Sequence, residues 1–167
     1  VAIPLKNLGS LARSRHDYAE AERLLTEALS IEERLSPGSL SQARSLRIMG
    51  LTALEKRDPY AAAKHLLRAL AIVQRLAPGS ALEAECLSIL GGIRRSSGRL
   101  GEAEDLFRQA VAALETQRGR AAASEEGRAS FAAQYADIYR SYIEVLVESN
   151  RAAEAFHALE RARARSF

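Results

Sequence analysis

Cysteine is almost absent from this sequence of 167 residues, in which Cys86 is the only one. A lone cysteine forms no internal disulfide and no cysteine-based zinc cluster, and it fits a reducing compartment, so we expect a cytoplasmic protein. Long apolar runs are also missing. Even the apolar stretch over residues 66–73 contains Arg68, whereas a membrane helix needs about 18 apolar residues in a row. We therefore expect no membrane partner.

Strand-forming residues are scarce. The sequence holds 5 Val, 8 Ile and 3 Thr against 32 Ala and 23 Leu, and only 5% of its residues are aromatic. Good helix formers therefore dominate. With 47% hydrophobic residues, the composition excludes disordered and collagen-like chains. We expect an all-α protein that forms one domain or one repeat array.

An excess of one charge is missing as well. The 24 basic and 21 acidic residues leave a net charge of +3, which is too even to indicate a nucleic-acid surface. The alternation Arg161, Arg163, Arg165 is read as a solvated helix face or as a nucleic-acid tail, and we favour the first. We expect no nucleic-acid partner.

An internal repeat sets the architecture. The Ser-Pro-Gly-Ser loop at residues 36–39 returns as Ala-Pro-Gly-Ser at 77–80, a shift of 41 residues, and a fourth copy follows the third after 52 residues. Small residues recur in the same register: Gly9, Gly50 and Gly91; Ala21, Ala62, Ala103 and Ala155; Ala28, Ala69, Ala110 and Ala162. Such periodicity predicts stacked repeats that bury one continuous core.

Each repeat reads as two helices. Helix starts are marked by Asp17, Ser39, Asp58 and Ser80, because their side chains can accept a hydrogen bond from a free amide of the first turn. The second helix of each repeat should end at the Pro-Gly loops, since proline lacks an amide and glycine adopts the left-handed conformation that ends a helix.

These residues resemble the tetratricopeptide repeat, whose pattern is a large residue, then Leu-Gly, then a large residue in helix A, and Ala, a large residue and Ala in helix B. The matching positions are Leu5, Leu8, Gly9, Ala12, Ala21, Leu25 and Ala28; Leu46, Met49, Gly50, Ala53, Ala62, Leu66 and Ala69; Leu87, Leu90, Gly91, Arg94, Ala103, Phe107 and Ala110; Tyr139, Tyr142, Ile143, Leu146, Ala155, Leu159 and Ala162.

The long repeat is similar to that of kinesin light chains and of many bacterial scaffold proteins. The resemblance implies a right-handed α-solenoid of about four antiparallel helix pairs. It implies a single array over residues 1–167, with repeats at about 3–37, 39–78, 80–116 and 124–165. It also implies protein-protein interaction as the function.

Catalytic groups do not converge. His16, His65 and His157 fall on different repeats, and Cys86 is read as a buried structural thiol or as a reactive one, of which we favour the first. No nucleophile, base and orienting group come together, and no metal or phosphate-binding motif is present. We expect no enzyme, no cofactor and no metal.

The family's concave groove is lined by helix A of every repeat. If the resemblance holds, its basic residues here are Lys6, Arg13, Arg44, Arg47, Arg95 and Arg140. We expect the first three repeats to bind an acidic or C-terminal peptide there, with Arg44 and Arg47 as carboxylate-binding forks. The alternative is a merely solvated face.

A second surface is predicted before the fourth repeat. Phe131, Tyr135, Ile138 and Tyr142 recur at helical spacing, and the first two lie outside the repeat template. They form either a partner surface or a packing stripe on the third repeat, which is the usual role of such stripes.

The C-terminal stretch resembles the last repeat before a CHAT domain, the caspase-like domain of bacterial tetratricopeptide arrays. The matching residues are Tyr139, Tyr142, Leu146, Asn150, Arg151, Ala155, Phe156 and residues 159–165. The start, Val-Ala-Ile-Pro-Leu-Lys, lacks Met and the layout of a signal peptide, so we expect a piece of a longer protein. The runner-up function is the regulatory or sensor arm of such a peptidase. An uncapped last repeat also predicts self-association.

Overall fold

The computed structural model describes residues 2–121 and 135–163 and divides the chain into two compact units, Val1–Leu76 and Ala77–Phe167. Within the described residues every regular element is an α-helix, as the composition predicts. The eight helices of these residues pack as antiparallel pairs. The handedness of the superhelix and the single array over 1–167 stay predictions.

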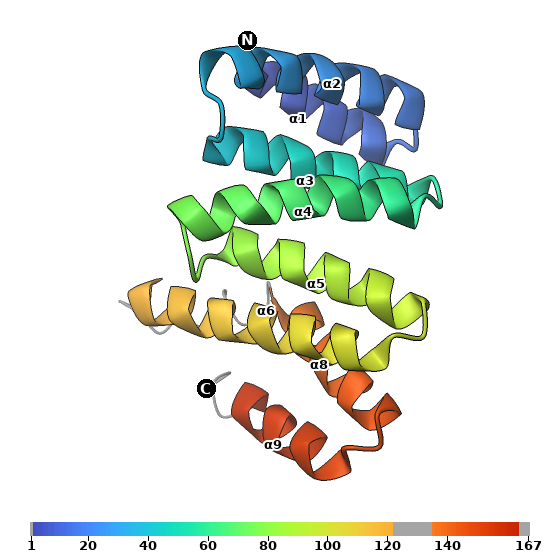
Figure 1. The fold of residues 1–167 in the computed structure, drawn as a ribbon, viewed down its shortest axis with the longest axis vertical. Helices are drawn as coiled ribbons and strands as arrows, with labels where there is room; N and C mark the ends of the chain where they lie inside the picture. The colour runs from blue at the N-terminus through green and yellow to red at the C-terminus, as the bar shows by residue number, and fades with distance from the viewer. Residues whose placement is uncertain (1, 122–134, 164–167) are drawn as a thin grey trace. The chain divides into compact units, whose positions relative to one another are not determined.

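The first unit consists of two helical hairpins. Helices α1 (Ala2–Ser14) and α2 (Tyr18–Leu35) form the first, and α3 (Leu40–Glu55) and α4 (Pro59–Leu76) form the second. Figure 1 shows the two hairpins side by side, and α3 contacts both α2 and α1. Helix A of the second repeat therefore packs across the first hairpin.

The second unit repeats this arrangement. Helices α5 (Ala81–Ser96) and α6 (Leu100–Ala121) form one hairpin, and α8 (Ala136–Glu148) and α9 (Ala152–Arg163) form the other (Figure 1). Helix α8 packs against both α5 and α6. Of the fourth predicted repeat, residues 124–134 lie outside the described residues.

The four predicted helix starts are confirmed. Asp17 and Asp58 accept hydrogen bonds from the amides of Glu20 at 3.2 Å and Ala61 at 2.9 Å. Ser39 and Ser80 cap α3 and α5 in the same way, each at 3.3 Å from the amide nitrogen three residues on. Helices α2 and α4 end at Leu35 and Leu76, just before the Pro-Gly loops, as predicted.

Within each hairpin the turn has one backbone geometry. The second residue after helix A has a positive φ in every case: 62° at His16, 64° at Arg57, 72° at Gly98 and 59° at Asn150. The residue after it donates its amide to a carbonyl five residues back, as in Asp17 to Ala12 at 3.0 Å, and this pattern is the Schellman motif. Only one of the four residues is the glycine that such a position favours.

Helices A and B approach each other closely where the repeat carries small residues. A Cβ atom added to Gly9 would lie 2.8 Å from Leu25 Cγ, and one added to Gly50 would lie 2.7 Å from Leu66 Cγ. Ala21, Ala62 and Ala103 are fully buried. The small-residue register is therefore confirmed as the point at which the helices cross.

Enlarging a crossing residue should destabilise the first unit. Ala62→Leu inserts three carbon atoms into a fully buried site, so we expect the free energy of unfolding to fall by about 1 to 3 kcal/mol. Ala71→Leu, at an exposed position of the same helix, is the matched control. Thermal melts check this, and equal melting temperatures for the two variants would contradict the crossing register.

Relieving backbone strain should have the opposite effect. Arg57 is exposed and holds a φ of 64°, a conformation that costs a residue with a side chain about 1 kcal/mol or more. Arg57→Gly should therefore raise the free energy of unfolding by about 0.5 kcal/mol, after allowing for the greater freedom of glycine in the unfolded chain. Arg57→Ala removes the same side chain and keeps the strain, so no gain is expected from it in parallel urea titrations.

Candidate functional site

Two of the six predicted groove cations are held by carboxylates of the neighbouring helix A. Arg13 Nη1 of α1 lies 2.5 Å from Glu55 Oε1 of α3. Two repeat periods later, Arg95 of α5 donates from Nη1 to Glu144 Oε2 at 2.6 Å and from Nε to Glu148 Oε2 at 2.9 Å, both on α8. The hydrogen bonds to Glu148 and Glu144 raise the pKa of Arg95 above its ordinary value. Both arginines therefore join successive hairpins.

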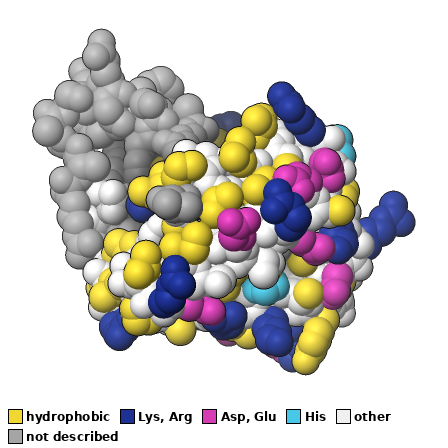
Figure 2. Space-filling view, turned by 90° about the horizontal axis from the view of Figure 1, so that it is seen from above, with side chains coloured by type: hydrophobic (Ala, Val, Ile, Leu, Met, Phe, Trp, Pro, Cys, Tyr) yellow, Lys and Arg dark blue, Asp and Glu magenta, His cyan; other side chains and the backbone are white. Residues whose placement is uncertain are grey.

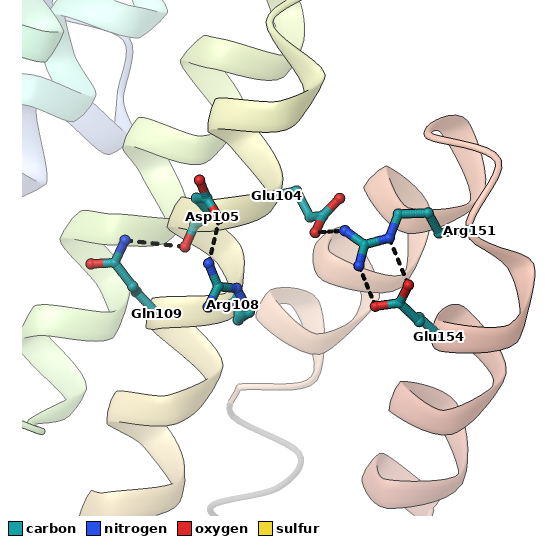
Figure 3. Close-up of polar contacts among 6 residues, drawn as sticks. All are labelled: Glu104, Asp105, Arg108, Gln109, Arg151 and Glu154. Carbon is teal, nitrogen blue, oxygen red and sulfur yellow. Dashed lines mark hydrogen bonds and ion pairs between the residues drawn. The ribbon is translucent and has the colours of Figure 1, made fainter.

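A second set of ion pairs joins the same hairpins from the turn side. Lys56, at the end of α3, donates to Glu22 of α2 at 2.7 Å. In the second unit Arg151 lies between Glu104 of α6 and Glu154 of α9, as Figure 3 shows. Glu104 stands two repeat periods after Glu22 and is only 8% exposed. We call these contacts, with those of Arg13 and Arg95, the hairpin clamps.

Sequence reasoning missed the hairpin clamps, although a signal was present. Arg13 and Arg95 share one register, and so do Glu22 and Glu104, whereas the intervening repeat carries Leu54 at the arginine position. This recurrence of charges two repeat periods apart is the signal from which a pairing between hairpins could have been predicted.

Lys6 is buried rather than open to a ligand. Its residue is 9% exposed, its Nζ donates to Ser41 Oγ of α3 at 3.0 Å, and it lies 3.9 Å from Glu32 Oε1 of α2. Burial lowers the pKa of Lys6, Glu32 opposes that shift, and the charge of Arg44 adds to it. Lys6 thus links three helices and contributes positive potential near Arg44.

Arg44 differs from the clamped arginines. It lies one turn from Arg47 on α3, which places the two side chains on the same face of the helix. Arg44 is exposed, and no carboxylate among the described residues pairs with it. Arg47 is half-buried. Of the predicted groove residues in the first unit, Arg44 is the one best placed to meet a ligand carboxylate.

The remaining site predictions fare differently. Arg140 of α8 is exposed and pairs with Asp137 of its own helix at 2.9 Å. Phe131 lies outside the described residues. Tyr135 is only 8% exposed. Whether it forms a partner surface or packs on the third repeat stays a prediction.

Cys86 is fully buried, and His16 contacts the Tyr18 hydroxyl at 2.9 Å. Within the part of the chain that the structure describes, no three His, Cys, Asp or Glu side chains cluster in a way that could hold a metal ion. None of the described helices combines the length and apolar composition of a bilayer crossing.

His65 occupies a position that the first repeat fills with Leu24, which is 6% exposed. Its Nδ1 is buried without a hydrogen-bond partner among the described residues. Burial first, and then the charges of Arg68 and Lys64, lower the pKa of His65 below its usual 6.5. The folded state thus binds a proton less readily than the unfolded chain does.

Acid should therefore weaken the first unit through His65. The stabilising contribution is complete above the unfolded pKa of about 6.5 and is lost as pH falls below it, since the unfolded chain takes up the proton first. In His65→Leu the free energy of unfolding should fall less between pH 7 and pH 5. Urea titrations at the two pH values measure this, with His157→Leu, at an exposed site, as control. An unchanged pH dependence in His65→Leu would contradict it.

Comparisons with known proteins agree with this geometry. The tetratricopeptide repeat family model matches residues 1–75 and 41–116. Among solved structures, BtubC (BKLC) from P. vanneervenii superimposes with a TM-score of 0.78 at 18% identity, over 98% of this chain and 62% of that one. The chain therefore spans less than two thirds of that protein.

Two further structures share the fold at lower scores. A Podosopora anserina protein described as a kinesin light chain, with nearly identical TPR-like repeats, gives a TM-score of 0.58 at 17% identity, over 97% of this chain and 93% of that one. The MamA protein gives 0.51 at 16% identity, over 98% and 91%. No curated protein matches the chain. These matches do not bear on the CHAT association, which stays a prediction.

Proposed function

Because the chain belongs to the tetratricopeptide repeat family, whose members are in general protein-protein interaction modules, we propose that it is a non-enzymatic scaffold that binds an acidic peptide. Arg44 carries this proposal. It is an exposed cation on α3, a helix A, without a carboxylate partner among the described residues. The buried charge of Lys6 adds positive potential beside it.

The hairpin clamps limit which of the predicted groove arginines can bind the peptide. Arg13 and Arg95 already hold carboxylates of their own units, so an acidic ligand would have to displace these carboxylates to bind there. Figure 2 shows basic, acidic and apolar side chains interspersed on one face of the molecule, not a basic field of the kind that favours nucleic acid. We therefore place peptide recognition at Arg44, with Arg47 one turn away as its supporting residue.

Charge reversal at Arg44 tests the proposal. Fluorescence anisotropy would compare labelled eight-residue peptides rich in Glu with their Gln counterparts, each with a free and with an amidated carboxyl terminus. The chain should bind the Glu peptides more tightly than the Gln peptides. Arg44→Glu should lower the affinity for the Glu peptides at least tenfold, because it replaces a charge-assisted contact by repulsion. The free-carboxyl and amidated arms show whether a terminal carboxylate adds to the recognition.

Lys64→Glu is the matched control for this experiment. It makes the same charge change at an exposed site of α4, a helix B, and should leave peptide affinity unchanged. The proposal would be overturned if both variants lost peptide affinity equally, or if the chain bound Glu and Gln peptides equally well. Binding of polynucleotide in place of peptide, with a steep salt dependence, would also overturn it.

A further inference from the structure

A cavity in the first unit lies where the start of α1, the end of α2 and the start of α3 meet. Its volume is about 460 Å³, which falls within the range of small-molecule sites. Ile3, Ile31 and Leu35 line it, so its surface is suited to an apolar body. Arg44 is not among its lining residues.

A buried acid forms part of the same wall. The side chain of Glu32 is only 4% exposed. The next two repeats place Val73 and Leu114 at this position, and both are fully buried. The equivalent position in the next two repeats is therefore apolar. Burying a carboxylate there costs free energy unless its oxygens have hydrogen-bond partners. A departure of this kind from the local pattern is typical of a functional position.

The pairing of Glu32 is incomplete. Oε1 accepts a hydrogen bond from Ser41 at 2.6 Å and lies 3.9 Å from Lys6 Nζ, which is too long for a hydrogen bond. Oε2 is buried and has no partner among the described residues. The last torsion of a glutamate is soft, so a turn of the carboxylate toward the cavity is the movement that a donor at Oε2 requires.

The surrounding charges select the kind of donor. Lys6 already stands beside Glu32, and Arg34 lies on the cavity wall. A cationic ligand at Oε2 would meet these two positive groups, and an anionic one would meet the carboxylate itself. A neutral group that donates one hydrogen bond avoids both penalties.

We propose that this cavity binds a small apolar molecule that carries a neutral hydroxyl group. The hydroxyl donates to Glu32 Oε2, and the apolar body contacts Ile3, Ile31 and Leu35. The site is separate from the proposed peptide site at Arg44 and does not depend on it.

Three matched probes test the ligand chemistry on the whole chain. 4-Ethylphenol carries the hydroxyl, 4-ethylanisole replaces the hydroxyl hydrogen by a methyl group and so has no donor, and 4-ethylbenzylamine is a cation. Amide chemical shifts of the ¹⁵N-labelled protein are followed during titration. 4-Ethylphenol should shift the amides of Ile31, Glu32, Leu35 and Ser41 saturably, and the ether and the amine should bind at least tenfold more weakly.

Two variants locate the binding. Glu32→Leu copies the residue of the third repeat and should weaken 4-ethylphenol at least tenfold, and Glu33→Leu, an exposed neighbour outside the cavity lining, should not. If Glu32→Leu fails to fold, Leu35→Ala, at a residue that is 69% exposed, removes part of the apolar wall and should still weaken binding severalfold.

The outcomes separate this proposal from peptide binding. The proposal would be overturned if 4-ethylphenol and 4-ethylanisole bound with equal affinity, or if 4-ethylbenzylamine bound more tightly than 4-ethylphenol. It would also be overturned if folded Glu32→Leu bound 4-ethylphenol with unchanged affinity, or if no amide shift saturated up to the solubility limit. Arg44→Glu should leave 4-ethylphenol binding unchanged. Failure of the peptide proposal can therefore be distinguished from failure of the cavity proposal.

Discussion

The close approach of helices A and B is the constraint on which the structure depends. Gly9 and Gly50 leave no room for a Cβ atom against Leu25 and Leu66, and fully buried alanines stand at the same crossings. A helix pair alone buries too little apolar surface. The crossings bring the two helices of each hairpin together, and within each unit two hairpins then pack against each other. The rest of each unit, including its charged contacts, is built on that geometry.

Features that depend on nearby residues were predictable from the sequence. The caps at Asp17 and Ser39 and the crossing at Ala62 follow from chemistry within a few residues or from the repeat itself. The turn conformation at Arg57 was not predictable in this way, because arginine is not a residue that favours positive φ. Local main-chain hydrogen bonds, from Arg57 to Leu54 and from Asp58 to Ala53, override that preference.

The candidate site was harder to predict because charge pairs form between distant residues. Arg13 and Arg44 look alike in the sequence, yet Arg13 holds Glu55 while Arg44 pairs with no carboxylate among the described residues. Lys6 is likewise a helix A cation that the fold buries. Helical spacing shows which residues share a face of a helix. It does not show which cations form ion pairs with carboxylates of the neighbouring hairpin, because those pairs depend on how the hairpins pack.

The shared turn geometry has a consequence for how the sequence can vary. Histidine, arginine, glycine and asparagine occupy one backbone conformation in four hairpins, so main-chain hydrogen bonds, not side-chain identity, hold the bend. The four turns should therefore be able to replace one another. A short segment transplanted from one hairpin to another should keep its shape, which makes these tips suitable places to graft a foreign epitope.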